Sequence, residues 1–441
     1  MFSHPPDWRK RLQPDFLQKA FKSEALNDLI KQAEKKYVDW NTFKHYQIPK
    51  DFIPETAWAY LKFNRFSNRE RTPVKSTAND SFTYIITKTM YKRLSFIDSN
   101  TSGFLGSDVE KPTEIQKNKL IISGLTEEAI ASSQIEGANT SRKVAKKMLL
   151  SKRKARNKDE QMIINNYQVM QRLLDWKDFP LSLNMLQDIQ KNITADTLED
   201  KNDEARLRTD KDNIGVVNRL TGEVVFTPPK QSVVLQELER LVEYANQKET
   251  DDGYVHPVIK ASILHFWLAY LHPFVDGNGR TARAIFYWYL LKNNYWVFQY
   301  LSVSRIIKKS KKQYDDSFLF TETDDDDMTY FLFYKLKAIV LSIKDFTEHY
   351  KNKIQNEKNI ENLSTRLTGF NQRQISLLQY CYMNPSTTID ILTHQSKHRV
   401  AYQTARTDIL NLVKKGHFSL MRKGLKFIFV PSPGKIKQLF K

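Results

Sequence analysis

Residues that can carry out phosphate chemistry are concentrated in one short stretch of the chain, between His272 and Arg283. The segments on either side, 256–271 and 282–291, are apolar on nearly every face and predict two buried helices. A polar loop that joins two buried helices is either a structural turn or an active site. Seven of its twelve positions hold residues with chemical functions: His272, Asp276, Gly277, Asn278, Gly279, Arg280 and Arg283.

The spacing of these residues suits a bound phosphate. Gly277 and Gly279 let the backbone turn tightly beside a ligand. They open the second helix, where free N–H groups and the helix dipole attract anions. Arg280 and Arg283 lie three positions apart, so we expect both to project from one face over the same anion. Asp276 supplies a hard oxygen ligand for Mg²⁺ next to that anion.

His272 completes the set, because its imidazole can accept a proton from an attacking hydroxyl. Each residue alone has an ordinary structural explanation. A lone histidine usually packs or is solvated, Gly-Asn-Gly is usually a turn, and two arginines at helical spacing are more often a solvated face. Their combination predicts a site that positions and stabilises a phosphoryl transfer.

The stretch from His272 to Arg283 resembles, without a mismatch, the Fic-family motif HPFx(D/E)GNGRxxR. The resemblance implies transfer of AMP from ATP to a hydroxyl of a target protein. His272 is then the general base and Asp276 the Mg²⁺ ligand. The implied nucleotide-binding residues include a phosphate nest and two arginines on the β and γ phosphates: Phe274, Gly277, Asn278, Gly279, Arg280 and Arg283.

The resemblance also bears on the group that is transferred. The death-on-curing relatives, which transfer a phosphate instead, have a lysine in place of Gly279, so AMP transfer is favoured here. The motif does not contact the base, and another nucleoside triphosphate therefore stays open as the donor.

A second short pattern lies upstream, where Ser132, Glu136 and Gly137 end a predicted helix over 126–137. Ser132 and Glu136 are one helical turn apart, and Gly137 is a typical stop signal. Alone, this would be an ordinary helix end with a solvated glutamate. Beside the other motif it resembles the family's (S/T)xxxE(G/N) inhibitory helix. The resemblance implies that Glu136 pairs with Arg283 and blocks the γ-phosphate, while Ser132 steadies the helix; alternatively, the carboxylate orients a water that removes AMP.

Residues 214–226 interrupt the helical pattern with two short apolar runs, which predict a β-hairpin with its turn at Leu220–Gly222. An isolated hairpin can be decoration. Its place before the motif is similar to that of the family's flap, which implies docking of the target protein by strand addition. Backbone pairing of this kind selects sequence only loosely. The implied docking residues are Ile214, Gly215, Val216 and Val217.

The predicted fold is mainly α: a Fic-type helical core with a β-hairpin flap, followed by a small C-terminal α+β domain of the winged-helix type. Residues 1–113 are expected to form a helical region that packs on the core or docks the target, with a loop over Ser67–Asp80. The core covers 114–362 and the winged-helix-like domain 366–441. The acidic run 321–329 is expected to cap the next helix rather than bind a metal.

The formal net charge is +19, and residues 366–441 contribute +11 of it (13 Lys or Arg minus 2 Asp or Glu). Three predicted helices and a hairpin carry this charge, which makes DNA contact physically reasonable, although such domains also bind proteins or form homodimers. The rival hypothesis is therefore a nucleotide-sensing, DNA-binding transcriptional regulator. For the enzyme, self-modification on an exposed hydroxyl is an expected side reaction.

Several features bear on where the protein works. No stretch approaches 18 consecutive apolar residues, and the first residues lack the pattern of a signal peptide. Cys381 is the only cysteine, so no intrachain disulfide is possible. These features predict a cytoplasmic protein that does not bind membranes.

Overall fold

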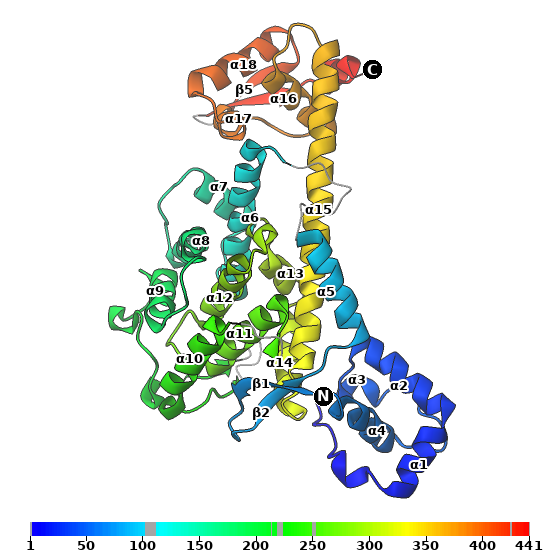
Figure 1. The fold of residues 1–441 in the computed structure, drawn as a ribbon. Coiled ribbons are helices and arrows are strands. Elements are labelled where there is room, and N and C mark those ends of the chain that lie inside the picture. The colour runs from blue at the N-terminus through cyan, green and yellow to red at the C-terminus, as the bar shows by residue number, and fades with distance from the viewer. Residues whose placement is uncertain are drawn as a thin grey trace. The chain divides into compact units, whose positions relative to one another are not determined.

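The computed structural model describes residues 2–101, 112–212, 214–217, 224–248, 253–423 and 426–440. The chain divides into two compact units, one of residues 1–149 and 154–346 and the other of residues 150–153 and 347–441. Helices dominate both units, which confirms the prediction of a mainly α fold (Figure 1). None of the helices in the described ranges combines the length and the apolar character that crossing a membrane requires. The domain boundaries drawn from the sequence stay predictions.

The first 101 residues of the larger unit form a helical layer and a β-hairpin. The hairpin pairs Glu70 with Tyr84 in antiparallel register. The predicted loop over Ser67–Asp80 is therefore wrong for the first strand, where Thr72 and Val74 are buried at alternate positions, as a half-buried strand requires. The elements are α1 (Pro14–Lys22), α2 (Glu24–Lys36), α3 (Trp40–Phe43), α4 (Pro54–Phe66), β1 (Glu70–Lys75), β2 (Ser81–Tyr84) and α5 (Lys88–Thr101).

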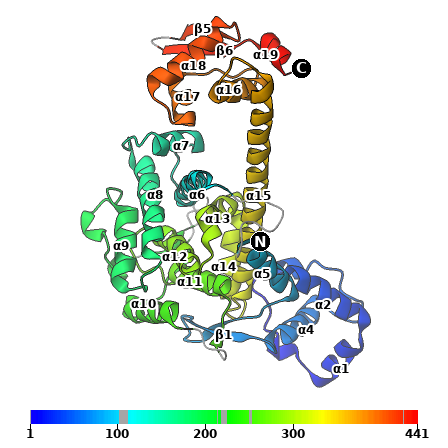
Figure 2. The same ribbon diagram turned by 45° about the horizontal axis from the view of Figure 1, so that its top comes forward.

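The rest of the larger unit is a helical bundle with one further hairpin. Helices α11 and α12 lie side by side, and α6, α8, α9 and α10 pack around them (Figures 1 and 2). The elements are α6 (Glu114–Ile135), α7 (Arg142–Leu150), α8 (Lys158–Trp176), α9 (Leu183–Thr194), β3 (Val216–Val217), β4 (Val224–Phe226), α10 (Gln231–Asn246), α11 (Pro257–Leu271), α12 (Asn278–Lys292), α13 (Val303–Lys309), α14 (Lys311–Thr323) and α15 (Thr329–Arg366), the last of which continues into the smaller unit.

Helix α11 is buried on almost every side, as its sequence predicts. Pro257 occupies the first turn, and the side chain of His256 accepts a hydrogen bond from the N–H of Val258. Helix α12 is also buried along most of its length. Because both helices are surrounded by other helices, the short turn between them is held rigidly at each end.

A buried cluster of charges fastens the N-terminal layer to the start of α15. Lys62 Nζ lies 2.8 Å from a carboxylate oxygen of Asp324, and Arg69 Nη2 lies 3.0 Å from Asp327. The hydroxyl of Tyr37 donates to Asp327 at 2.6 Å. Burial alone would raise the pKa of Asp327, but Arg69 and Lys62 hold that pKa below its ordinary value. The N-terminal layer is therefore joined to the core by paired, desolvated charges.

The sequence predicts helix capping for the acidic run that contains these aspartates, and one of them fits that prediction. Asp327 Oδ1 accepts a hydrogen bond from the N–H of Thr329 at 3.1 Å, at the first residue of α15. The buried ion pairs are an additional role that local sequence does not reveal, because their partners lie some 260 positions away. Strand β2 is joined to the same run: the N–H of Met328 donates to the carbonyl of Thr83 at 2.8 Å.

After the end of α15, the described residues of the smaller unit form three helices, an antiparallel strand pair and a further helix. Leu378, Ile409 and Phe429 belong to its separate apolar core. The order of three helices followed by a hairpin matches the expectation from sequence; the winged-helix assignment and DNA contact stay predictions. The elements are α16 (Gln372–Met383), α17 (Ile391–His398), α18 (Tyr402–Lys414), β5 (Phe418–Lys423), β6 (Lys426–Pro431) and α19 (Pro433–Leu439).

We expect Asp327→Ala to lower the free energy of unfolding by about 3–5 kcal/mol, because it leaves buried cationic partners without their counter-charge. Urea denaturation measures this loss. The control is Asp28→Ala, which removes an exposed pair with Lys31 and should cost no more than about 1 kcal/mol. Equal losses in the two variants would show that the cluster does not hold the layers together.

Candidate active site

His272 lies directly after the last residue of α11, in the left-handed conformation at φ 48°. Its backbone N–H donates to the carbonyl of Leu268 at 3.0 Å. Its ring Nδ1 lies 3.3 Å from the carbonyl oxygen of Ala269. Because a carbonyl can only accept, Nδ1 carries the proton and Nε2 is the nitrogen with a free lone pair. Burial lowers the pKa of His272, although the contact with Ala269 opposes this effect. The ring is thus held as a neutral base.

Arg208 braces the turn that follows His272, and sequence reasoning missed it. Its Nε donates to the carbonyl of His272 at 2.7 Å, and its Nη2 donates to the carbonyls of Leu271, at 3.2 Å, and Pro229. Its backbone N–H donates to the carbonyl of Pro273 at 2.8 Å. One buried guanidinium therefore satisfies carbonyls that the end of α11 leaves without partners. No local pattern identifies such a residue.

Two amide side chains hold the remainder of the turn. Gln190 donates to the carbonyl of Asp276 at 3.0 Å. Asn278 accepts from the N–H of Phe274 at 2.9 Å and donates to its carbonyl at 2.8 Å. The side chain of Asn278 therefore shapes the loop, and only its backbone is left for the predicted phosphate nest. The ring of Phe274 is fully buried, and its backbone forms a bridge with Leu207; a nucleotide contact for it stays a prediction.

The two glycines of the motif are required for different reasons. Gly277 starts α12 at φ +83°, and a Cβ there would lie 2.9 Å from a methyl group of Thr194. A Cβ on Gly279 would lie 2.2 Å from Glu136 Oε1. The first turn of α12 is therefore bare of side chains at both positions, which leaves its backbone N–H groups near the surface that an anion would approach.

Arg280 and Arg283 contact different groups of the chain, and their expected contact with one anion stays a prediction. Arg280 Nη1 donates to the carbonyl of Ile193 at 2.9 Å. Its Nε and Nη2 are buried and have no hydrogen-bond acceptor within the described part of the chain; the nearest carboxylate oxygen, from Asp276, lies 3.6 Å from Nη2. Burial lowers the pKa of Arg280. Two unsatisfied cationic donors beside a helix N-terminus fit an anionic ligand.

Arg283 is bound by the end of α6 through two of its three guanidinium nitrogens. Its Nε donates to Ser132 Oγ at 2.8 Å, and its Nη2 donates to the Ser132 carbonyl at 3.1 Å and to Glu136 Oε1 at 2.8 Å. Burial alone would raise the pKa of Glu136, but Arg283 holds that pKa below its ordinary value. The pair is therefore ionised, and it occupies the guanidinium that the sequence assigns to the nucleotide.

The position of α6 depends on Gly137 of the second motif and on one residue outside both motifs, Glu128. Gly137 lies at φ 102°, just after the helix ends, as its stop signal predicts. Inside the helix, the buried carboxylate of Glu128 accepts hydrogen bonds from the hydroxyls of Tyr287 and Ser302, at 2.8 and 3.0 Å, and from Ser304. Glu128 thus ties α6 to α12 and α13. Sequence reasoning missed it, because its partners are distant in the chain.

The predicted flap contains an antiparallel pair of short strands. Val216 lies opposite Phe226. Ile214 and Gly215 precede the first strand, and the predicted turn at Leu220–Gly222 lies outside the described residues. The ring of Phe226 lies 5.2 Å from that of Tyr270, near the end of α11. The flap is therefore packed against α11 at Tyr270, two positions before His272.

Asp276 fits a cation bound jointly with phosphate. Its side chain is 49% exposed, and its Oδ1 accepts a hydrogen bond from the N–H of Gly277 at 2.5 Å. Mg²⁺ is commonly held by one or two carboxylates together with the phosphates of a substrate. Among the residues that the structure describes, no three His, Cys, Asp or Glu side chains are grouped to hold a metal. A cation here would therefore depend on a bound nucleotide.

Residues 180–290 match a family model described as the Fic/DOC family. This range includes the loop between α11 and α12 and the flap, but not Glu136. The chain is 40% identical over 60 residues to protein adenylyltransferase fic-1 of Caenorhabditis elegans, and 32% identical over 68 residues to protein adenylyltransferase Fic of Drosophila grimshawi. These alignments cover 14% and 15% of this chain and only 11% and 14% of the two relatives.

Similar solved structures include a Fic family protein from Desulfovibrio desulfuricans, at a TM-score of 0.46 and 15% identity over 78% of this chain and 94% of that one. Another is residues 134–508 of Fic-1 from Caenorhabditis elegans, at a TM-score of 0.46 and 18% identity over 58% of this chain and 71% of that one.

We expect Arg208→Ala to destabilise the turn after α11, because several buried carbonyls lose their donor, at a cost of about 3 kcal/mol. Hydrogen exchange at residues 272–277 and urea denaturation measure the loss. Arg206→Ala is the matched control, since its partly exposed guanidinium pairs with Asp203 and Asp212 and should contribute no more than about 1 kcal/mol. Unchanged exchange at 272–277 in Arg208→Ala would contradict the assignment.

Proposed function

We propose that this chain, which carries a Fic domain over residues 180–290, is a protein adenylyltransferase that moves AMP from ATP to a Ser, Thr or Tyr hydroxyl. The observation that carries the proposal is His272, a neutral base with its lone pair on Nε2, beside the N-terminus of α12 and the unsatisfied donors of Arg280. The names of the partial relatives support the same activity.

In the proposed reaction, each group of the site has a separate role. His272 Nε2 takes the proton of the target hydroxyl while the hydroxyl oxygen attacks the α-phosphorus of ATP, and pyrophosphate leaves. The N–H groups at the start of α12 and the donors of Arg280 stabilise the negative charge on the phosphates. Asp276 would hold Mg²⁺, which supplies positive charge to the phosphates when bound. The flap would hold the target by strand addition.

The proposed enzyme inhibits itself through Glu136. Its carboxylate takes Arg283 away from the γ-phosphate and lies over Gly279, where a Cβ would meet it at 2.2 Å. A bound triphosphate then lacks its contact with Arg283, and the carboxylate of Glu136 repels it at the predicted phosphate nest. The same carboxylate could orient a water for removal of AMP, which makes a bifunctional enzyme the nearest alternative. Self-modification of an exposed hydroxyl is expected once the ion pair between Glu136 and Arg283 is broken.

The rival function is a nucleotide-sensing regulator that binds DNA through the smaller unit. The specific observation in its favour is the exposed face of α18, which presents Gln403, Arg406 and Thr407, whereas the acid of that helix, Asp408, is buried against Arg373 at 2.6 Å. This face is polar and basic, as contact with a phosphate backbone requires. Absence of AMP transfer in every variant below would favour this reading.

We expect Glu136→Gly to raise transfer of label from α-labelled ATP to proteins in a cell lysate by about tenfold or more, because a charge-assisted bond of about 1.5–3 kcal/mol no longer holds Arg283. His272→Ala should lower transfer by about 10²–10⁴-fold through loss of the general base. Glu127→Ala, which removes another acid of α6 that pairs with Arg142, is the control. Equal labelling by Glu136→Gly and wild type would exclude self-inhibition.

The pH dependence of the Glu136→Gly variant gives a further expectation. Burial lowers the pKa of His272 from the ordinary 6.5, so the neutral base persists to lower pH than usual. Glu136 raises that pKa, so its removal moves the pKa no higher. Transfer should therefore fall on acidification with a midpoint below pH 6.5. Rates measured between pH 5 and 8 decide this, and a midpoint above 6.5 would contradict His272 as the base.

A further inference from the structure

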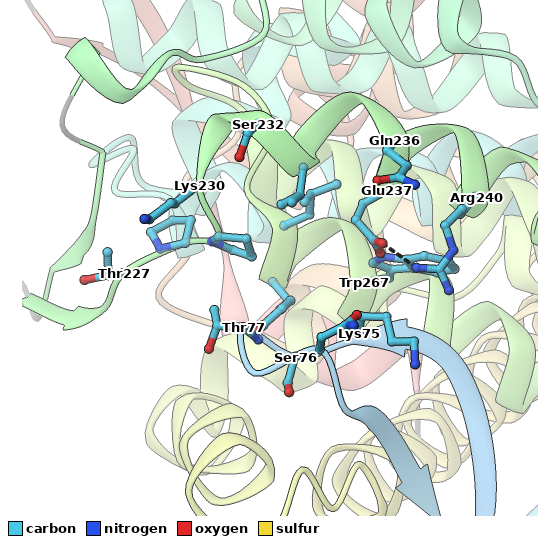
Figure 3. Close-up of a pocket in the computed structure, with 16 residues that line it drawn as sticks. Lys75, Ser76, Thr77, Thr227, Lys230, Ser232, Gln236, Glu237, Arg240 and Trp267 are labelled. Carbon is cyan, nitrogen blue, oxygen red and sulfur yellow. Dashed lines mark hydrogen bonds and ion pairs between the residues drawn. The ribbon is translucent and has the colours of Figure 1, made fainter.

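A groove of about 820 Å³ lies beside the segment that follows the flap, and its lining includes the residue before the proposed base. One wall is the end of β1 with the loop that follows it, which contribute Lys75, Ser76 and Thr77, and the opposite wall is α10 (Figure 3). Trp267, Tyr270 and Leu271 of α11 also line it, and Leu271 directly precedes His272. A groove of this size can hold several side chains of a bound chain.

The N-terminal hairpin is held in place as a wall of this groove. Arg240 Nη2 on α10 donates to the carbonyl of Pro73 at 2.6 Å. The N–H of Thr77 donates to the hydroxyl of Tyr270 at 3.1 Å. The ring of Phe82 lies 5.2 Å from that of Tyr270. These contacts join β1, β2, α10 and α11, so the groove is a built feature of the larger unit.

The groove begins where the flap can no longer bind a partner strand. After β4 the chain continues as Thr227-Pro228-Pro229-Lys230, and all four residues line the groove. The two prolines have no backbone N–H, so a partner strand paired along the flap cannot continue past them by backbone hydrogen bonds. Recognition of a longer segment must therefore change to side-chain contacts at this point, and the groove lies where that change occurs.

The lining defines the chemistry of the occupant. The floor combines prolines with the buried faces of Trp267 and Leu271, and Val233 adds an apolar side chain that is 36% exposed. Glu237 is already engaged, since it accepts from Arg240 and from Trp267 Nε1 at 3.2 Å. Two lysines line the groove, Lys75 and Lys230, and neither forms an ion pair within the described ranges. Because Arg240 and Glu237 neutralise each other, these lysines give the lining a net positive charge.

We propose that this groove binds the segment of the protein substrate that flanks the modified hydroxyl, through one large apolar side chain and a neighbouring carboxylate. The apolar floor would take the side chain, and Lys75 and Lys230 would attract the carboxylate. The inference rests on the proposed function, because it needs a protein substrate whose hydroxyl lies at His272. It assigns to residues 70–84 a direct part in substrate choice.

The test uses the full-length Glu136→Gly protein, α-labelled ATP and degenerate peptide libraries that each contain one hydroxyl residue and one fixed residue at a set distance from it. We expect a large apolar residue and an acidic residue to be selected at defined positions. In Lys75→Glu combined with Lys230→Glu, the ratio of labelling of acidic to neutral peptides should fall by about fivefold or more. Lys248→Glu, at an exposed lysine of the same region that does not line the groove, should keep the ratio.

A second pair of variants tests the apolar contact. Val233→Arg should reduce the preference for the large apolar residue, whereas Leu235→Arg should not, since Leu235 is 50% exposed on the same helix but does not line the groove. Selection ratios that are equal in the parent and in both groove variants, or that change equally in the controls, would overturn the groove assignment while AMP transfer stands. No labelling of any peptide or of the protein itself by Glu136→Gly would instead overturn the proposed function.

Discussion

The site depends on one constraint: α11 ends inside the protein, and its last carbonyls must find donors that no helix can supply. Arg208 meets most of this need with a single buried guanidinium, and Asn278 closes the loop on itself. The position of His272 therefore follows from contacts with residues more than sixty positions earlier. Because Arg208 also donates to Pro229, one guanidinium bonds both to the segment that follows the flap and to the end of α11.

Two further sets of long-range contacts converge on the same turn. Glu128 holds α6 against α12 and α13, and so fixes where the end of α6 delivers Glu136. The buried ion pairs of Asp324 and Asp327 hold the N-terminal layer against the start of α15. The hydrogen bond from Met328 to Thr83 joins β2 to the same segment. The loop between β1 and β2 is thereby positioned beside α11. Residues that touch no substrate thus determine the shape of the surface that would receive one.

Sequence alone predicted the parts of the site that depend on local pattern. The burial of α11 follows from apolar residues on all of its faces, and the stop of α6 follows from Gly137 at positive φ. Contacts between residues distant in the chain were not predictable in this way. Arg208, Glu128 and Lys62 look like ordinary surface charges in the sequence, since nothing near them indicates that a carbonyl or a counter-ion from elsewhere will bury them.

The same limit explains the error over β1. The composition of Ser67–Asp80, rich in Ser, Thr, Asn and Pro, predicts a loop; pairing with β2, whose Phe82 packs on Tyr270 of α11, makes part of it a strand. The spacing of Arg280 and Arg283 correctly placed both on α12, and their contact with one anion stays a prediction. Their partners differ because Ile193 and Ser132 approach the helix from different elements.

The contact between Gly279 and Glu136 has a consequence for how such a protein can diverge. The bare backbone at position 279 is the surface on which the carboxylate lies, so any side chain there must push that carboxylate from its place, 2.8 Å from Arg283. The proposed nucleotide contact and the proposed self-inhibition would therefore depend on the same position. If the proposal holds, a lineage that gains a side chain at 279 would change both properties in one step.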